Sequence, residues 1–157
     1  MKAKARFLGH PIHQMLVVFP LGLLGTSVVF DLIHHVGGSP EMALVAYWTM
    51  AAGLVGGLIA APFGMVDWLA IPRGTRAKTV GALHGTGNVL VLMLFLASWM
   101  ARREVPTEPQ LVATAAAVGG FAVAGMTAWL GGELVDRLGI GVDDGAHPNA
   151  PSSLRQP

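Results

Sequence analysis

Four long stretches without any formal charge limit what this chain can fold into. They cover residues 7–30, 42–66, 79–101 and 109–132. A bilayer core about 30 Å thick is crossed by roughly 20 helical residues, and tilt or local thinning absorbs small differences from that length. The sequence therefore predicts an all-α, integral membrane four-helix bundle. We expect its helices at about 12–36, 42–69, 79–102 and 109–136.

Composition excludes several other classes of protein. Hydrophobic residues make up 53% of the chain and charged residues 12%, whereas a soluble domain carries about a quarter charged residues. A net charge of +1 fits neither a disordered chain nor a protein that binds nucleic acid. The chain has no cysteine, which excludes disulfides and thiolate metal sites. Any metal would need His, Asp, Glu or Met ligands.

The distribution of basic residues predicts the orientation in the membrane. Eight lie on the side of the two termini: Lys2, Lys4, Arg6, Arg73, Arg76, Lys78, Arg137 and Arg155. Only Arg102 and Arg103 lie on the opposite side, so the positive-inside rule places both termini in the cytoplasm. We expect a transmembrane domain over residues 1–142 and a disordered cytoplasmic tail over 143–157, which is rich in Pro and small polar residues. No convincing tandem repeat is evident.

Ionisable side chains are predicted to converge at the cytoplasmic ends of the helices. The first span brings His10 and His13 there, the second Asp67 and the third His84. Asn88 follows His84 one turn deeper, and the fourth span delivers Glu133. Because ionisable residues inside a membrane usually mark functional sites, this convergence predicts a His/Asp site, with interhelical hydrogen bonding as the structural alternative.

Two local patterns favour such a site. In HPIHQ, Pro11 suits the first helical position, which places His10 at the cap and His13 on the same face one turn later. The third span carries a small and polar stripe that is expected to face the bundle interior; it consists of Gly81, His84, Gly85 and Asn88.

A second polar group lies at the opposite end of the first span. It comprises Asp31, His34 and His35. We interpret Asp31 mainly as an interfacial anchor or a helix-end hydrogen bond, and a second site there stays open.

The ordered landmarks HPIHQ, VVFPLGLLG, Asp31, Trp48, GMVD, His84 with Asn88, and GGELV–GIGV resemble the bacterial membrane-protein family called domain of unknown function 2231. The similarity covers residues 8 to about 142. Gln14 stands where the family pattern usually has Pro. The resemblance implies a four-helix domain of the bacterial inner membrane, sometimes fused to Rieske or cytochrome c modules, and thus a link to electron transfer.

Three hypotheses about function remain open. In the first, the protein binds a cofactor in membrane electron transfer with a redox partner. The cofactor is either haem b held by His13 and His84 or a divalent metal ion held by a larger set, namely His10, His13, Asp67 and His84. In the second, Asp67 and His84 relay protons or a small solute. In the third, the chain anchors or assembles a redox complex. No established catalytic motif is present, and the sequence leaves a homo-oligomer open.

Overall fold

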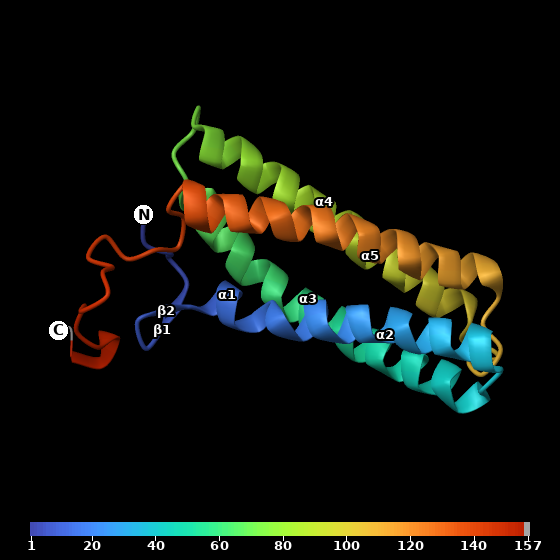
Figure 1. Cartoon of the computed structure of the whole chain (residues 1–157). Coiled ribbons are helices and arrows are strands. Elements are labelled where there is room, and N and C mark those ends of the chain that lie inside the picture. Colours follow the sequence, from blue (N-terminus) through green and yellow to red (C-terminus); the bar gives the residue numbers. More distant parts are fainter. Residues whose placement is uncertain (156–157) are drawn as a thin grey trace.

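The computed structural model describes residues 1–155 and consists almost entirely of long helices (Figure 1). The helices are α1 (Ile12–Leu16), α2 (Val18–Gly37), α3 (Pro40–Ala70), α4 (Arg76–Ala101) and α5 (Leu111–Gly132). A π-helix (Glu133–Arg137) continues α5, and a 3-10 turn covers Ser153–Arg155. Counting α1 with α2 and the π-helix with α5, four segments of 26, 31, 26 and 27 residues are long and apolar enough to cross a membrane. The predicted all-α, four-helix membrane fold is confirmed.

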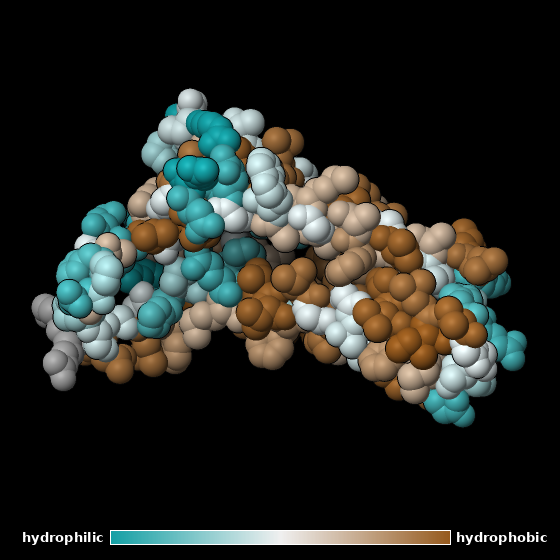
Figure 2. Space-filling model, in the orientation of Figure 1, coloured by the Kyte–Doolittle hydropathy of each residue, from teal (hydrophilic) through white to brown (hydrophobic). Residues whose placement is uncertain are grey.

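The four long helices, α2 to α5, run in alternating directions along the bundle, and α1 leads into α2 (Figure 1). Both termini and the linker 71–75 therefore lie at one end, called here the terminal end, while residues 38–39 and 102–110 lie at the far end. Figure 2 shows hydrophobic side chains on the surface of the middle of the bundle and hydrophilic ones gathered at its ends. An exposed apolar surface between two polar ends matches the profile of a bilayer.

Local chemistry sets the helix boundaries. The ring of Pro20 lacks an N–H and clashes with the carbonyl four residues earlier, and α1 accordingly ends at Leu16, before α2 begins at Val18. Gly38 ends α2 in the left-handed conformation (φ 68°) and donates its N–H to His34 O at 2.7 Å, which only glycine does without strain. Thr75 caps α4 by accepting the Lys78 N–H at 3.2 Å.

Ahead of α1, the chain forms a short β-hairpin of β1 (Arg6–Phe7) and β2 (His10–Pro11). Its turn residues Leu8 and Gly9 both have positive φ, 49° and 87°, as tight two-residue hairpin turns require. The expected cap at His10 is therefore wrong. His10 pairs with Phe7 in the hairpin, and Pro11 is the cap of a helix that begins at Ile12.

After the π-helix, the chain returns along the N-terminal segment (Figure 1). The Met1 ammonium donates to Gly139 O at 2.8 Å, and Asp143 accepts an ion pair from Lys2 at 3.1 Å and one from Arg6 at 3.3 Å. The hydrogen bond from the Gly145 N–H, followed by the Lys2 ammonium, lowers the pKa of the Asp143 carboxyl. Disorder of the tail 143–157 stays a prediction, and its residues 156–157 lie outside the described part of the chain.

The core lies between the hairpins α2–α3 and α4–α5. Its buried side chains, drawn from all four long helices, are Leu24, Val28, Met50, Leu54, Val91, Phe95 and Ala117. Towards the far end the packing includes charge: Arg102 Nη1 contacts Asp31 Oδ1 at 2.6 Å, and both side chains are fully buried. Arg102 also donates from Nη2 to Ser98 Oγ at 2.8 Å. A buried charge is tolerated where a counter-charge lies beside it; here Arg102 contacts Asp31 Oδ1, while Asp31 Oδ2 is buried without a hydrogen-bond partner among the described residues.

The Arg102→Gln substitution tests the energetic weight of this pair. It leaves the Asp31 carboxylate buried without its counter-charge, and removing one partner of a buried pair costs roughly 3–5 kcal/mol. We expect a loss of about that size in the free energy of unfolding, measured in detergent micelles by circular dichroism. The neighbouring Arg103 is exposed and pairs with the exposed Glu104, so Arg103→Gln is the matched control. Equal losses in the two variants would contradict the assignment.

Candidate functional site

The His13 imidazole is held by α3. Its Nδ1 lies 3.0 Å from Ala60 O, and the ring rests on Gly64, where an added Cβ would come within 2.8 Å of the ring Cε1. The main-chain oxygen can only accept, so Nδ1 carries the proton and Nε2 carries the lone pair; this tautomer is assigned from the hydrogen bond. Gly64 is therefore required for the close approach of α1 and α3.

His84 is held by α5 in the same way. Its Nδ1 lies 2.8 Å from Thr127 O, and an added Cβ at Gly131 would lie 3.2 Å from the ring Cε1. The Asn88 amide Nδ2 contacts both Nε2 of His84, at 3.2 Å, and its main-chain oxygen, at 2.8 Å. The Thr127 hydroxyl in turn donates to Asn88 Oδ1 at 3.1 Å. His84 thus belongs to a network joining α4 to α5.

The two imidazoles lie beside each other in a T-shaped arrangement. Their ring centroids are 6.4 Å apart, with the ring planes at 90°, and both side chains are half-buried. They come from the first and third spans. His13 is oriented by α3 and His84 by α5, in each case the next span along the chain. The structure therefore brings His13 and His84 together at the terminal end of the bundle.

Asp67 binds main chain rather than imidazole. Its Oδ1 accepts the N–H groups of Lys4 and Ala5 at 2.6 and 3.0 Å, and the Ala5 carbonyl accepts the Ile12 N–H at 3.0 Å. The Asp67 carboxylate thereby holds the N-terminal segment, which in turn contacts Ile12, the residue before His13. Hydropathy could not predict this role, because the pattern of apolar residues does not say where an N-terminal segment folds back.

The remaining predicted residues at this end are engaged elsewhere. His10 is exposed, with Nε2 3.3 Å from Ser153 Oγ, and Glu133 pairs with Arg76 at 2.5 Å. Within residues 1–155, no three His, Asp or Glu side chains form a group that could hold a metal ion. The four-residue set of His10, His13, Asp67 and His84 is thus not assembled, whereas its two-imidazole subset is.

Asp31 lies at the far end, well away from these residues, and its partner Arg102 was missed by the sequence analysis. The first and third spans run in the same direction, so residues near their ends share a depth; that signal would have paired the two. Beside them, His34 Nδ1 lies 2.8 Å from Ser39 O and His35 Nε2 lies 2.9 Å from Thr114 Oγ1. Asp31 and His35 thus join α2 to the end of α4 and to α5, whereas His34 joins α2 to the linker that follows it.

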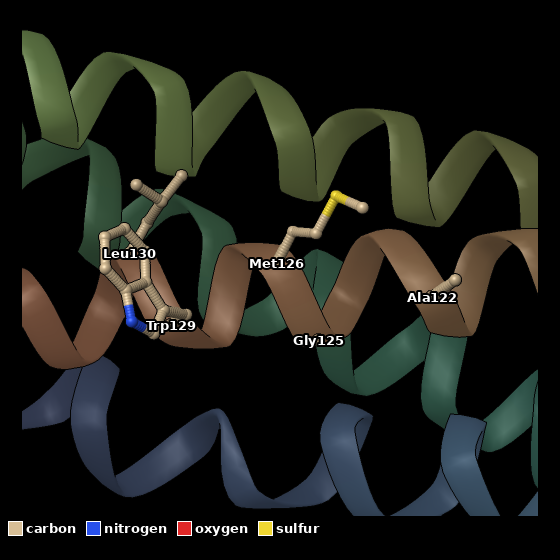
Figure 3. Close-up of a pocket in the computed structure, with 5 residues that line it drawn as sticks. All are labelled: Ala122, Gly125, Met126, Trp129 and Leu130. Atoms are coloured by element: carbon tan, nitrogen blue, oxygen red, sulfur yellow. The ribbon is translucent and has the colours of Figure 1, made fainter.

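A separate hollow of about 560 Å³ lies along α5. Figure 3 shows that the residues lining it follow one another along this helix: Ala122, Gly125, Met126, Trp129 and Leu130. The lining is apolar, and none of these five residues is a predicted site residue. This surface is typical of a lipid-facing helix.

These observations define an integral membrane four-helix protein with polar pairs at both ends of its bundle. The family described as "Predicted membrane protein (DUF2231)" matches residues 9–144. The chain belongs to this family, as its resemblance to domain of unknown function 2231 predicted. No curated protein and no solved structure matches the chain.

The contacts of Asp67 generate a test. Asp67→Ala removes the acceptor for two main-chain amides, and hydrogen bonds to a charged group are worth about 1.5–3 kcal/mol. We expect hydrogen exchange at Lys4 and Ala5 to accelerate roughly ten- to a hundredfold, measured by mass spectrometry or NMR. Asp67→Asn keeps one acceptor oxygen and should accelerate exchange less. Unchanged exchange in Asp67→Ala would rule out the role given to this carboxylate.

Proposed function

We propose that this protein binds a b-type haem between His13 and His84 and carries electrons in the membrane alongside a redox partner. The observation that supports this most is the neighbouring pair of imidazoles, 6.4 Å apart between ring centroids and supplied by two different helices. Ligation of a haem in a helix bundle uses side chains that project inward from facing helices.

The chemistry of the two side chains fits this role. His13 and His84 would each offer Nε2 as a ligand to the bound group, because Nδ1 of each ring is engaged with a main-chain carbonyl. With ring centroids 6.4 Å apart, the two rings are near enough for one group to bind both. In each ring the hydrogen bond from Nδ1 to a carbonyl fixes the orientation and raises the basicity of Nε2.

Asn88 competes for one of the two ligating nitrogens. Its amide Nδ2 lies 3.2 Å from His84 Nε2, the atom that would bind iron. Haem binding therefore requires this amide to turn away from the imidazole. The hydroxyl of Thr127, which already donates to Asn88 Oδ1, offers Asn88 an anchor that does not depend on the ring.

A bound haem would supply a one-electron redox centre. The protein itself would supply two imidazole ligands, His13 and His84, and the main-chain carbonyls that hold them. A divalent ion held by His10, His13, Asp67 and His84 is less well supported, since His10 and Asp67 contact Ser153, Lys4 and Ala5 instead.

A proton relay is the second candidate, and the hydrogen bonds around His84 favour it. The His84 imidazole, the Asn88 amide and the Thr127 hydroxyl form a hydrogen-bonded network, in which His84 could take up and release a proton without a cofactor. The structural alternative, an anchor or assembly partner of a redox complex, needs neither haem nor a proton path. For all three functions we propose the bacterial inner membrane with cytoplasmic termini, on the basis of the eight-to-two distribution of basic residues.

A visible spectrum tests the haem proposal. The purified chain, titrated with haem in detergent or nanodiscs, should show the Soret band and low-spin spectrum of a bis-imidazole haem. His13→Ala and His84→Ala should each abolish that low-spin spectrum because each removes an axial ligand. The control is His10→Ala, which removes an exposed imidazole of the same motif and should change nothing. A folded chain without a Soret band after titration would contradict the proposal and favour the anchor.

Asn88→Ala separates the haem from the relay. Removing the competing amide should leave haem affinity unchanged or raise it, as measured by haem titration. A relay through Asn88 would instead lose proton flux in liposomes on the same substitution. Loss of the Soret band in Asn88→Ala, with the fold intact, would count against the ligand assignment for His84.

A further inference from the structure

Two contacting pairs are separated by the same number of residues. Asp31 and Arg102 form the ion pair of the far end and are 71 residues apart. His13 and His84 lie beside each other at the terminal end, and they too are 71 residues apart (84 − 13). Both pairs join the α1–α2 segment to α4. Equivalent positions of these two segments therefore meet at both ends of the bundle.

The contacts inside each helical hairpin repeat as well. In both hairpins an imidazole bonds to a main-chain carbonyl of the second helix and rests on a glycine four residues further along that helix. The second-helix residues are Ala60 and Gly64 in the first hairpin and Thr127 and Gly131 in the second, 67 residues later (127 − 60 and 131 − 64).

A third contact, in the middle of the bundle, obeys the same two offsets. An added Cβ at Gly53 would lie 2.7 Å from Leu24 Cγ, and one at Gly120 would lie 3.0 Å from Phe95 Cδ2. Phe95 follows Leu24 by 71 residues (95 − 24), and Gly120 follows Gly53 by 67 (120 − 53). The agreement therefore extends along the whole length of the hairpins and is not confined to the histidines.

The directions of the helices define the relation between the two hairpins. α2 and α4 both run from the terminal end to the far end, and α3 and α5 both return (Figure 1). Equivalent helices that run in the same direction are related by a two-fold axis along the bundle, which in a membrane protein lies along the membrane normal. Residues that touch their own equivalents, such as His13 and His84, must lie beside this axis.

We infer that the chain consists of two equivalent helical hairpins, α1–α3 and α4–α5, related by a pseudo-two-fold axis along the membrane normal. His13 and His84 then form one site on this axis, where a single ligand takes equivalent bonds from both halves. The repeat follows from the contacts alone. The identity of the ligand as a bis-imidazole haem rests on the proposed function.

At the far end the two halves carry opposite charges at equivalent positions, Asp31 and Arg102. Identical charges at positions 31 and 102 would repel each other beside the axis, whereas Asp31 and Arg102 attract. The supporting residues still correspond: Arg102 donates to Ser98, four residues before it, and Ser27 stands four residues before Asp31. The opposite charges thus favour contact between the first hairpin and the second over contact between two copies of the same hairpin.

Exchanging the two charges in the full-length chain tests the repeat. Asp31→Arg and Arg102→Asp alone each place like charges in contact and should lose the folded protein or lower its Tm in detergent. The double variant restores the ion pair with the two charges exchanged. We therefore expect its Tm to lie closer to the Tm of the unmodified chain than to the Tm of either single variant. A double variant as unstable as the single ones would overturn the inferred equivalence.

Ser27→Ala and Ser98→Ala separate true equivalence from simple charge attraction. In the unmodified chain Ser98 supports the guanidinium, so Ser98→Ala should lower the Tm more than Ser27→Ala. In the exchanged chain the guanidinium lies at position 31, and the order of the two effects should reverse. An unchanged order would show that the two halves are not equivalent at this end.

The ligand part of the inference has its own measurement. Titrated with haem in the Asn88→Ala background, which removes the amide that competes for His84 alone, His13→Ala and His84→Ala should lose affinity by similar factors and yield similar five-coordinate spectra. Strongly unequal losses of haem affinity would overturn the shared ligand site of His13 and His84. The charge-exchange variants would still decide whether the two hairpins are equivalent. If the unmodified chain binds no haem, the proposed function fails, and the charge exchange still decides the repeat.

Discussion

An unpaired polar group inside an apolar bundle is costly, and this constraint governs how the four spans meet. At the far end Asp31 and Arg102 are both fully buried and satisfy each other's charge. At the terminal end the imidazoles of His13 and His84 bond to main-chain oxygens of neighbouring helices. These contacts fix the helices along their length and around their axes, which the non-directional burial of apolar side chains does not do. The polar groups thus define the relative position of the two hairpins.

Glycine makes those polar contacts geometrically possible. A side chain at Gly64 would meet the His13 ring at 2.8 Å and force it away from α3, and one at Gly131 would crowd the His84 ring at 3.2 Å and require a small shift. In membrane bundles, small residues commonly let helices approach closely for packing. Here they also place an imidazole against a main-chain acceptor, and so they belong to the architecture of the candidate site as much as to the packing.

The sequence was sufficient for the spans and the family but not for every contact. Charge-free stretches predicted four helices because crossing a bilayer demands length and low charge. Arg102 was counted as a linker charge, although its burial depends on Asp31 from another span. Asp67 was placed among the imidazoles, although its partners are amides of a segment without hydropathic periodicity. The repeat left only short identities, such as Leu-Val-Ala at both 44–46 and 111–113, which common apolar residues make easy to overlook.

The use of main-chain oxygens to hold both imidazoles has a consequence for how this family varies. The side chains that belong to these oxygens differ, Ala60 in one hairpin and Thr127 in the other, yet the hydrogen bond to the ring is the same. A carbonyl is supplied by any residue that keeps the helix intact. Position 60 could therefore take another small side chain that fits its buried site without removing the acceptor for His13. At position 127 the main chain orients the His84 ring while the hydroxyl holds Asn88, so a change of side chain there would alter the surroundings of His84 but not the acceptor of its Nδ1.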